Sequence, residues 1–172
     1  QVQYSLLDQR PAGEMSSLCQ AHGIALLCYG TVAGGFLSDR WLGRPEPDEP
    51  LENRSLVKYK LIIDDFGGWD LFQQLLQTLK RVADRHGATL SAVASRHVLD
   101  QPHVAGVIVG ARNASHLPAT LAVEGLRLTD DDRGEIAAVL ARRTGPFGEV
   151  YALERDRTGP HGSIMKYNLG NS

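Results

Sequence analysis

The chain has 172 residues, 42% of them hydrophobic and 22% charged, which is typical of one globular domain that can bury its own core. With 18 Lys and Arg against 20 Asp and Glu, the net charge is -2, and no apolar run approaches the roughly 18 residues of a membrane-spanning helix, so we expect neither nucleic acid nor a membrane as partner. Two cysteines without metal-ligand spacing predict no disulfide scaffold, no metal site and a reducing, cytoplasmic location.

The first thirty residues predict a β–α–β unit. Apolar and polar residues alternate over 1–7, which predicts a strand, and apolar residues at helical spacing follow over 15–21. His22-Gly23 is typical of a helix stop. The run over 24–29 is continuously apolar, as in a strand that a parallel sheet covers on both faces. Because the first residue, Gln1, already belongs to a strand, we expect a fragment of a longer chain.

The middle of the chain predicts loops and then helices. Small residues over 30–38 and three prolines within 39–50 indicate two consecutive loops. Apolar spacing then predicts three helices, over 55–65, over 71–83 and, with Thr89 as N-cap, over 90–99.

The last part of the chain predicts one more strand and two more helices. They are expected over 104–109, near 114–123 and from 129 to 143. The Gly- and Pro-rich remainder predicts a surface tail, with the charged residues 154–157 in solvent. Strands alternating with helices indicate an α/β fold. We therefore expect one α/β unit over 1–143 and a tail over 144–172.

Two strand ends carry residues suited to an anionic ligand, because α/β folds bind ligands beyond the carboxyl ends of their strands. The second predicted strand ends at Tyr29 and is followed by Gly30, Thr31, Val32, Ala33 and Gly34. Glycine lets a ligand approach the backbone closely, and backbone N–H groups can face phosphate oxygens. The loop matches neither GxGxxG nor GxxxxGK[ST], and an ordinary glycine turn is an equally good interpretation.

The third predicted strand is followed by Gly110, Ala111, Arg112 and Asn113, which open a helix. A helix N-terminus attracts anions, and the planar guanidinium of Arg112 can grip a phosphate. Taken alone, Arg112 is more simply a solvated side chain beside a helix start. Two such segments after neighbouring strands favour one long, phosphate-rich ligand.

Three segments resemble the carboxyl-terminal half of an aldo-keto reductase. They are QVQYS at 1–5, LCYGTVAGGFLSDR at 27–40 and VIVGARNASHL at 107–117, in matching order and spacing. The resemblance covers about residues 1–142. It implies a partial (β/α)8 TIM barrel, with three parallel strands that would be the sixth, seventh and eighth of the barrel. It also implies NADP(H) as cofactor, bound without a Rossmann fold.

The resemblance implies a cofactor contact for each candidate residue. Gln1 would hydrogen-bond the nicotinamide carboxamide, and Tyr29 would stack on the nicotinamide ring. The pyrophosphate would be lined by Gly30, Thr31, Val32, Ala33 and Gly34. Arg40 would reach a phosphate.

The adenosine end of the cofactor would meet the segment after the third strand. There Arg112, preceded by Gly110 and Ala111, matches a contact to the 2′-phosphate, which favours NADP over NAD. His116 stands where the family has Gln or Arg. Thr120 retains one hydrogen-bonding group of the pair that holds adenine in the family, and Ala119 retains none.

The family's catalytic Asp, Tyr, Lys and His would all precede Gln1, so no catalytic residue is assigned. The implied function is the NADP(H)-binding portion of an oxidoreductase that reduces aldehydes and ketones by hydride transfer, with a small carbonyl compound as substrate of the parent enzyme. Because three strands leave two open edges, we expect self-association or pairing with a missing N-terminal half. The alternative is a non-catalytic nucleotide-binding or regulatory module, or an inactive truncated product.

Overall fold

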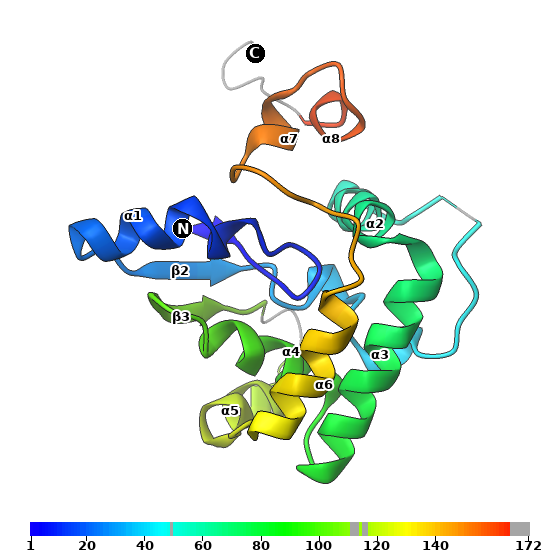
Figure 1. Ribbon diagram of the computed structural model, residues 1–172. Coiled ribbons are helices and arrows are strands. Elements are labelled where there is room, and N and C mark those ends of the chain that lie inside the picture. The colour runs from blue at the N-terminus through cyan, green and yellow to red at the C-terminus, as the bar shows by residue number, and fades with distance from the viewer. Residues whose placement is uncertain (49, 111–113, 115–116, 166–172) are drawn as a thin grey trace.

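A computed structural model describes residues 1–48, 50–110, 114 and 117–165 (Figure 1). The three strands are β1 (Val2–Gln3), β2 (Leu26–Tyr29) and β3 (Val104–Ile108). They form one parallel sheet in the order β1-β2-β3. The predicted α/β fold with three parallel strands is therefore confirmed.

The first strand is much shorter than the predicted 1–7. After β1 the backbone groups of Ser5 and Asp8 bond to each other in both directions at 3.2 Å. The hydroxyl oxygen of Ser5 also accepts from the N–H groups of Leu7 and Asp8. These local bonds close a turn that takes the backbone out of the sheet, because a serine side chain can replace a ladder partner.

Eight α-helices lie in the described residues, together with three short 3-10 turns. The helices are α1 (Glu14–His22), α2 (Arg54–Phe66), α3 (Gly68–Arg85), α4 (Leu90–Leu99), α5 (Leu117–Gly125), α6 (Asp130–Leu140), α7 (Ala152–Arg155) and α8 (Pro160–Ser163). The 3-10 turns are Arg10–Ala12, Ala33–Gly35 and Asp39–Trp41. As predicted, α1 ends at a left-handed Gly23, and the side chain of Thr89 caps α4. None of the described helices is long and apolar enough to cross a membrane.

Helices cover one face of the sheet, while the other face carries exposed apolar side chains. Leu26 and Cys28 of β2 are buried in one cluster with Cys19 of α1 and Val98 of α4. Leu27 points away from this cluster and is 44% exposed. The prediction that this strand is covered on both faces is therefore wrong for the described residues. A continuous apolar run shows that a strand can be buried on both faces, not that both covers are present.

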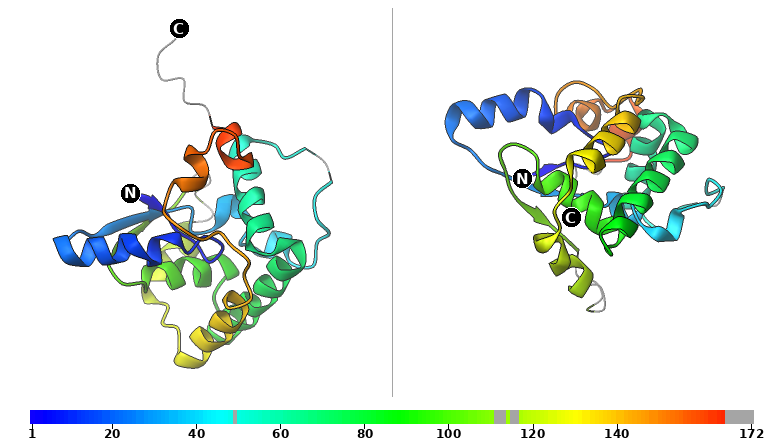
Figure 2. Two further views of the ribbon diagram at one scale, coloured as in Figure 1. Left: turned by 45° about the horizontal axis from the view of Figure 1, so that its top comes forward. Right: turned by 60° about the horizontal axis from the view of Figure 1, so that its bottom comes forward.

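The larger core lies beside the sheet, among α2, α3, α4 and α6 (Figures 1 and 2). Phe36, from the loop after β2, is fully buried there and meets the rings of Trp41, Trp69 and Phe72 with centroids 4.9–6.3 Å apart. The loop that follows β2 is thus anchored to the helical core through its own aromatic residue. Such anchoring fixes the position of the residues at the end of β2.

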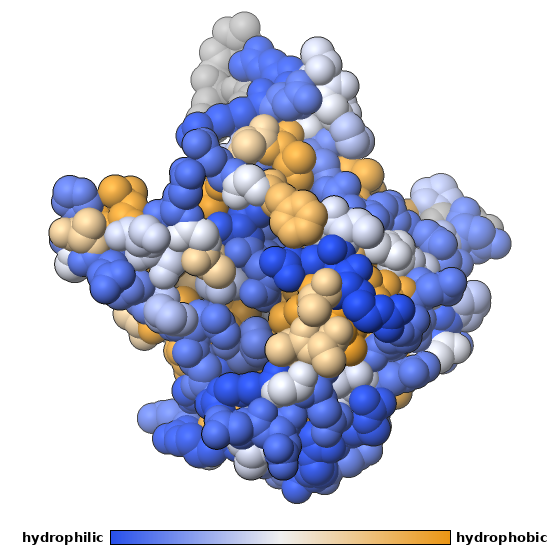
Figure 3. Space-filling model, viewed as in Figure 1, coloured by the Kyte–Doolittle hydropathy of each residue, from blue (hydrophilic) through white to orange (hydrophobic). Residues whose placement is uncertain are grey.

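The segment after α6 folds back over the start of the chain. Glu154 is buried and accepts hydrogen bonds from Arg10 at 3.1 and 3.2 Å, so the prediction that it lies in solvent is wrong. His161 of α8 contacts the Asp65 carboxylate of α2 at 2.7 Å. Figure 3 shows hydrophobic residues gathered where the segment between α6 and α7 crosses the face seen in Figure 1. Contacts from Glu154 and His161 therefore hold this segment, including the short helices α7 and α8, against the start of the chain and helix α2.

Stability should depend on pH through His97 of α4. Burial lowers the pKa of His97 to about 4 from its ordinary 6.5. Between these two values the unfolded chain binds more protons than the folded one, so the free energy of unfolding falls as the pH drops from 6.5 towards 4. In urea denaturation at pH 7 and pH 5, His97→Gln should show a smaller loss than the wild-type chain. The exposed His22→Gln is the control, and equal losses for all three proteins would contradict the assignment.

Candidate functional site

The carboxyl ends of the three strands lie at one edge of the sheet. Tyr29, the last residue of β2, pairs with Gln3 of β1 on one side and Ile108 of β3 on the other. The loop from Gly30 and the segment from Gly110 therefore leave neighbouring strands on the same side. This is the arrangement that a ligand spanning both segments needs.

Glycines are needed at two positions of the loop after β2, because a tyrosine of helix α2 lies directly against them. Gly30 has φ +73° and Gly34 has φ +64°, both in the left-handed region. A Cβ atom on Gly30 would stand 2.4 Å from the hydroxyl of Tyr59, and one on Gly34 would stand 2.8 Å from its ring. The glycines thus let Tyr59, which is 7% exposed, lie directly against the loop. Tyr59 is a neighbour that the sequence interpretation missed.

The loop also offers unused backbone donors. The N–H groups of Ala33, Gly35, Phe36 and Leu37 bond to carbonyls within the loop. In the described part of the chain, the N–H groups of Thr31 and Val32 have no protein acceptor. An anion placed beyond the end of β2 could accept from both, as phosphates do at other loops of this kind.

Two predicted site residues point their side chains into the protein. Thr31 is 2% exposed, and its hydroxyl lies 3.0 Å from that of Ser95 on α4. Ala33 is fully buried with φ +48°, an unusual value for a residue other than glycine. Only the backbone of these two residues is placed to meet a ligand, while Val32 is half-buried and Gly34 exposed.

Tyr29 is half-buried at the edge and close to the folded-back segment. Burial raises the pKa of Tyr29, and the nearby Tyr151 and Glu154 raise it further, so the phenol is neutral at physiological pH. Tyr151 donates a hydrogen bond of 2.9 Å to the backbone carbonyl of Gln1, which is itself an exposed residue. Gln1, Tyr29 and Tyr151 therefore lie within one small region.

The remaining candidates are spread more widely. Arg40 is exposed and its guanidinium lies 5.5 Å from the ring centre of Trp41. Gly110 is exposed just after β3, and Thr120 is half-buried on α5. Ala111, Arg112 and His116 lie outside the described residues.

A buried ion network lies beneath this edge, and no local pattern in the sequence indicates it. Asp8 accepts two hydrogen bonds from the Arg10 guanidinium at 2.8 and 2.9 Å, one from the Arg10 backbone N–H at 3.3 Å and one from the Gln3 amide at 3.1 Å. Burial opposes the charge of Arg10, but its hydrogen bonds to Asp8 and Glu154 raise its pKa, and the cation persists. Lys58 stands 3.9 Å from Glu154, so two carboxylates face two cations. The network links the turn after β1 to helix α7.

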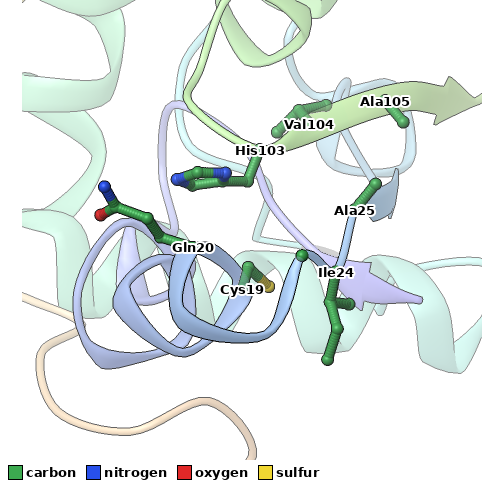
Figure 4. A pocket seen from close by; sticks show the side chains of 8 residues that line it. Cys19, Gln20, Ile24, Ala25, His103, Val104 and Ala105 are labelled. Carbon is green, nitrogen blue, oxygen red and sulfur yellow. The ribbon is translucent and has the colours of Figure 1, made fainter.

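A hollow of about 420 Å³ lies at the opposite edge of the sheet (Figure 4). Cys19, Gln20 and His103 line it, with residues just before β2 and the first two residues of β3. It opens at the amino ends of these strands, so a ligand there would not reach Tyr29. In barrels of this kind the amino-terminal face carries stability and the carboxyl-terminal face carries function.

A parallel sheet with helices on one face, whose strands end together at a glycine loop, is the arrangement that α/β barrels repeat around their axis. The sequence profile of the Aldo/keto reductase family matches residues 1–141. This chain belongs to that family, as the resemblance of its strand-end segments implied.

Three curated proteins are similar to this chain in sequence. It is 36% identical over 103 residues to "Flagellar radial spoke protein 5" of Chlamydomonas reinhardtii, covering 58% of this chain and 19% of that protein. It is 27% identical over 136 residues to "Aryl-alcohol dehydrogenase GME11368" of Pestalotiopsis microspora, with 79% and 32% covered. It is 28% identical over 134 residues to "Pyridoxal reductase, chloroplastic" of Arabidopsis thaliana, with 77% and 33% covered. The chain thus spans no more than a third of their lengths.

Solved structures agree on the fold. The glycerol dehydrogenase AKR11B4 of Gluconobacter oxydans matches with a TM-score of 0.67 and 21% identity, over 85% of this chain and 43% of that one. The holo form of the aldo-keto reductase AKR11C1 of Bacillus halodurans matches with a TM-score of 0.56 and 30% identity, over 80% and 42%. The first likeness shows the fold alone, and both structures extend well beyond the matched part.

Proposed function

We propose that this chain is the NADP(H)-binding portion of an aldo-keto reductase, with the dinucleotide lying along the carboxyl edge of the sheet. The observation that carries the proposal is the pair of N–H groups at Thr31 and Val32, in the loop after Tyr29, which have no acceptor among the described residues. The family membership and the reductase and dehydrogenase relatives support it. A small aldehyde or ketone is the proposed substrate of the complete enzyme.

The described residues fit a nicotinamide cofactor in chemistry and position. The neutral, half-buried phenol of Tyr29 offers a flat surface to a nicotinamide ring, and Gln1, which directly precedes the neighbouring strand β1, would bond its carboxamide. The two free N–H groups would hold pyrophosphate oxygens, and Arg40 would add a positive charge on the same side. When bound, the cofactor supplies the hydride.

The catalytic acid is not assigned to any residue of this chain. The contribution of the described residues is to bind and orient the cofactor. Tyr4 and Tyr59, two further tyrosines near this edge, are buried, and burial raises the pKa of each to about 12. Burial therefore favours the protonated phenol in both.

Substitution of Tyr29 tests the stacking role. Tyr29→Ala removes the ring, and we expect NADPH affinity to fall about 5- to 150-fold, since loss of an aromatic stacking surface costs about 1–3 kcal/mol. Tyr29→Phe keeps the ring and should bind within about twofold of the wild type. Titration followed by NADPH fluorescence measures both. Equal affinities for the Ala and Phe variants would contradict the stacking role.

Cofactor preference is proposed to depend on Arg112. Its guanidinium would pair with the 2′-phosphate that NADP carries and NAD lacks. Arg112→Ala should therefore weaken NADPH binding and leave NADH binding nearly unchanged, as measured by calorimetry with both cofactors. An unchanged ratio of the two affinities would exclude this assignment.

A second candidate function is a non-catalytic nucleotide-binding or regulatory module. The 36% identity to a protein named as a flagellar radial spoke component favours it, because that relative's name describes a structural assembly. Carbonyl reduction assayed with NADPH in the protein from its natural source separates the two. Turnover supports the reductase, whereas NADPH binding without turnover supports the module.

A further inference from the structure

Tyr151, which directly precedes helix α7, has an unusual backbone conformation. Its φ is +70° and its ψ is -2°, in the left-handed region that residues other than glycine rarely adopt. Among the described residues, Ala33 and His103 are the other non-glycine residues with a positive φ. Such a conformation persists where surrounding contacts enforce it, and it is common at functional sites. The contacts that hold Tyr151 therefore indicate what its position serves.

The side chain of Tyr151 joins α7 to the start of β1. Its ring packs against the buried cluster that includes Val2 and Tyr4. Its hydroxyl donates a hydrogen bond of 2.9 Å to the backbone carbonyl of Gln1, the residue directly before β1. The guanidinium of Arg155 lies 5.8 Å from the centre of the Tyr151 ring. These contacts together give the ring and the hydroxyl one orientation.

The buried ion network fixes helix α7 itself. Glu154, three residues after Tyr151, accepts two hydrogen bonds from Arg10, which also bonds Asp8 in the turn after β1. Helix α7 and the residue before it thus contact the chain on both sides of β1, at its start through Tyr151 and at the turn after it through Glu154. This double attachment enforces the strained backbone of Tyr151.

Gln1 is the residue whose position the Tyr151 hydroxyl restrains. The first residue pair of β1 is Val2 with Cys28, so Gln1 lies just outside the paired part of the strand. The pKa of Tyr29 is raised by burial and, next, by the nearby Tyr151, so the same contact lies close to the phenol of Tyr29. The family profile ends at residue 141 and does not account for a contact made by Tyr151.

We propose that Tyr151 is a positioning residue for the nicotinamide end of the cofactor site. It fixes the backbone of Gln1, and thereby the direction in which the Gln1 side chain reaches the carboxamide. This inference rests on the proposed function, because it takes Gln1 as the residue that meets that group. The hydroxyl carries the positioning role while the ring packs against the buried cluster, so a substitution can separate the two.

Isothermal titration calorimetry with two ligands tests the positioning role. The ligands are NADPH and 2′,5′-ADP, which has the adenosine end of the cofactor but no nicotinamide. Tyr151→Phe removes the hydroxyl and keeps the ring. Its NADPH affinity should fall about 2- to 10-fold, as expected for the loss of one hydrogen bond, while its affinity for 2′,5′-ADP should equal that of the wild type. A general loosening of the fold would weaken both ligands alike and would overturn the proposal.

A double-mutant cycle tests whether the effect passes through Gln1. In a Gln1→Ala background, which lacks the side-chain amide, Tyr151→Phe should cause no further loss of NADPH affinity. Tyr4→Phe is the matched control, since Tyr4 is 1% exposed and its hydroxyl has no partner among the described residues. This control should leave the affinities for both ligands unchanged.

The outcomes separate this inference from the cofactor proposal. An unchanged NADPH affinity in Tyr151→Phe, or fully additive losses in the double variant, would overturn the positioning role and leave the cofactor proposal in place. A loss in Tyr4→Phe as large as that in Tyr151→Phe would also overturn the positioning role. No NADPH binding to the wild-type chain would overturn the cofactor proposal, and this inference with it.

Discussion

Arg10→Ala should lower the free energy of unfolding by about 3–5 kcal/mol. The Arg10 guanidinium is 2% exposed and bonds two carboxylates, Asp8 and Glu154, which are themselves 1% and 8% exposed. Removing the cation takes away the guanidinium that both buried carboxylates share, and the loss of one partner from a buried ion pair costs about 3–5 kcal/mol. Urea denaturation followed by circular dichroism measures the loss.

Two further variants test whether the loss of stability comes from the buried ion network rather than from removing any charged side chain. Arg81 pairs with Glu135 at 3.5 Å on the surface, so Arg81→Ala should cost less than about 1 kcal/mol. Glu154→Gln should cost less than Arg10→Ala, since it leaves the Asp8–Arg10 pair intact. If Arg10→Ala were as mild as Arg81→Ala, the network would not hold helix α7 to the turn after β1.

Gly30→Ala should destabilise the protein by about 2–5 kcal/mol. The new Cβ would lie 2.4 Å from the hydroxyl of Tyr59 and 3.3 Å from Cγ of Gln3. Overpacking of a buried site costs about 1–3 kcal/mol, and φ +73° adds about 1–2 kcal/mol of backbone strain for a residue with a side chain. NADPH affinity should fall too, because Thr31 and its free N–H follow directly.

A second glycine with a similar φ separates the effect of the contact with Tyr59 from the effect of backbone strain. Gly43 has φ +70°, and a Cβ atom added to it would meet nothing within 4 Å, so Gly43→Ala should cost only the strain of about 1–2 kcal/mol. Tyr59→Phe removes the clashing hydroxyl and should recover part of the loss in the Gly30→Ala background. Equal losses at both glycines would show that Tyr59 does not press on the loop.

Local sequence signals are sufficient to predict most helices. The apolar stripe over 71–83 corresponds to α3 (Gly68–Arg85), and Thr89 caps α4 as expected. These features depend on residues within one or two turns of each other, so a single sequence contains the information. The parallel order of the strands follows from their alternation with helices.

Contacts between distant residues escape prediction. Glu154 resembles a solvated charge because its partner, Arg10, lies near the other end of the chain. Tyr59 resembles an ordinary residue of α2, and nothing near it in sequence indicates the glycines it touches. The strand β1 ends early because Ser5 bonds backbone groups locally, which alternation alone does not reveal. Apolar alternation predicts which residues can be buried, and tertiary partners decide which are.

At the candidate site, too, the local sequence predicts some features, while contacts between distant residues decide the others. The sequence predicts the loop after β2 and the segment after β3 at neighbouring strand ends, and the register of Tyr29 with Ile108 places their described parts there. Which groups of the loop can bind a ligand is not predictable, because the Thr31 side chain is buried against Ser95 while its backbone N–H has no acceptor among the described residues. The site therefore depends more on backbone geometry than on the side chains of the loop.

The most direct measurement is an NMR titration of the ¹⁵N-labelled chain with NADPH, following individual backbone amides. We predict that the amides of Thr31 and Val32 shift strongly and saturate together, while those of Ala25 and Ala105 at the opposite edge stay in place. Shifts confined to Ala25 and Ala105, or no saturable shift at Thr31 and Val32, would show that no dinucleotide binds at the carboxyl edge.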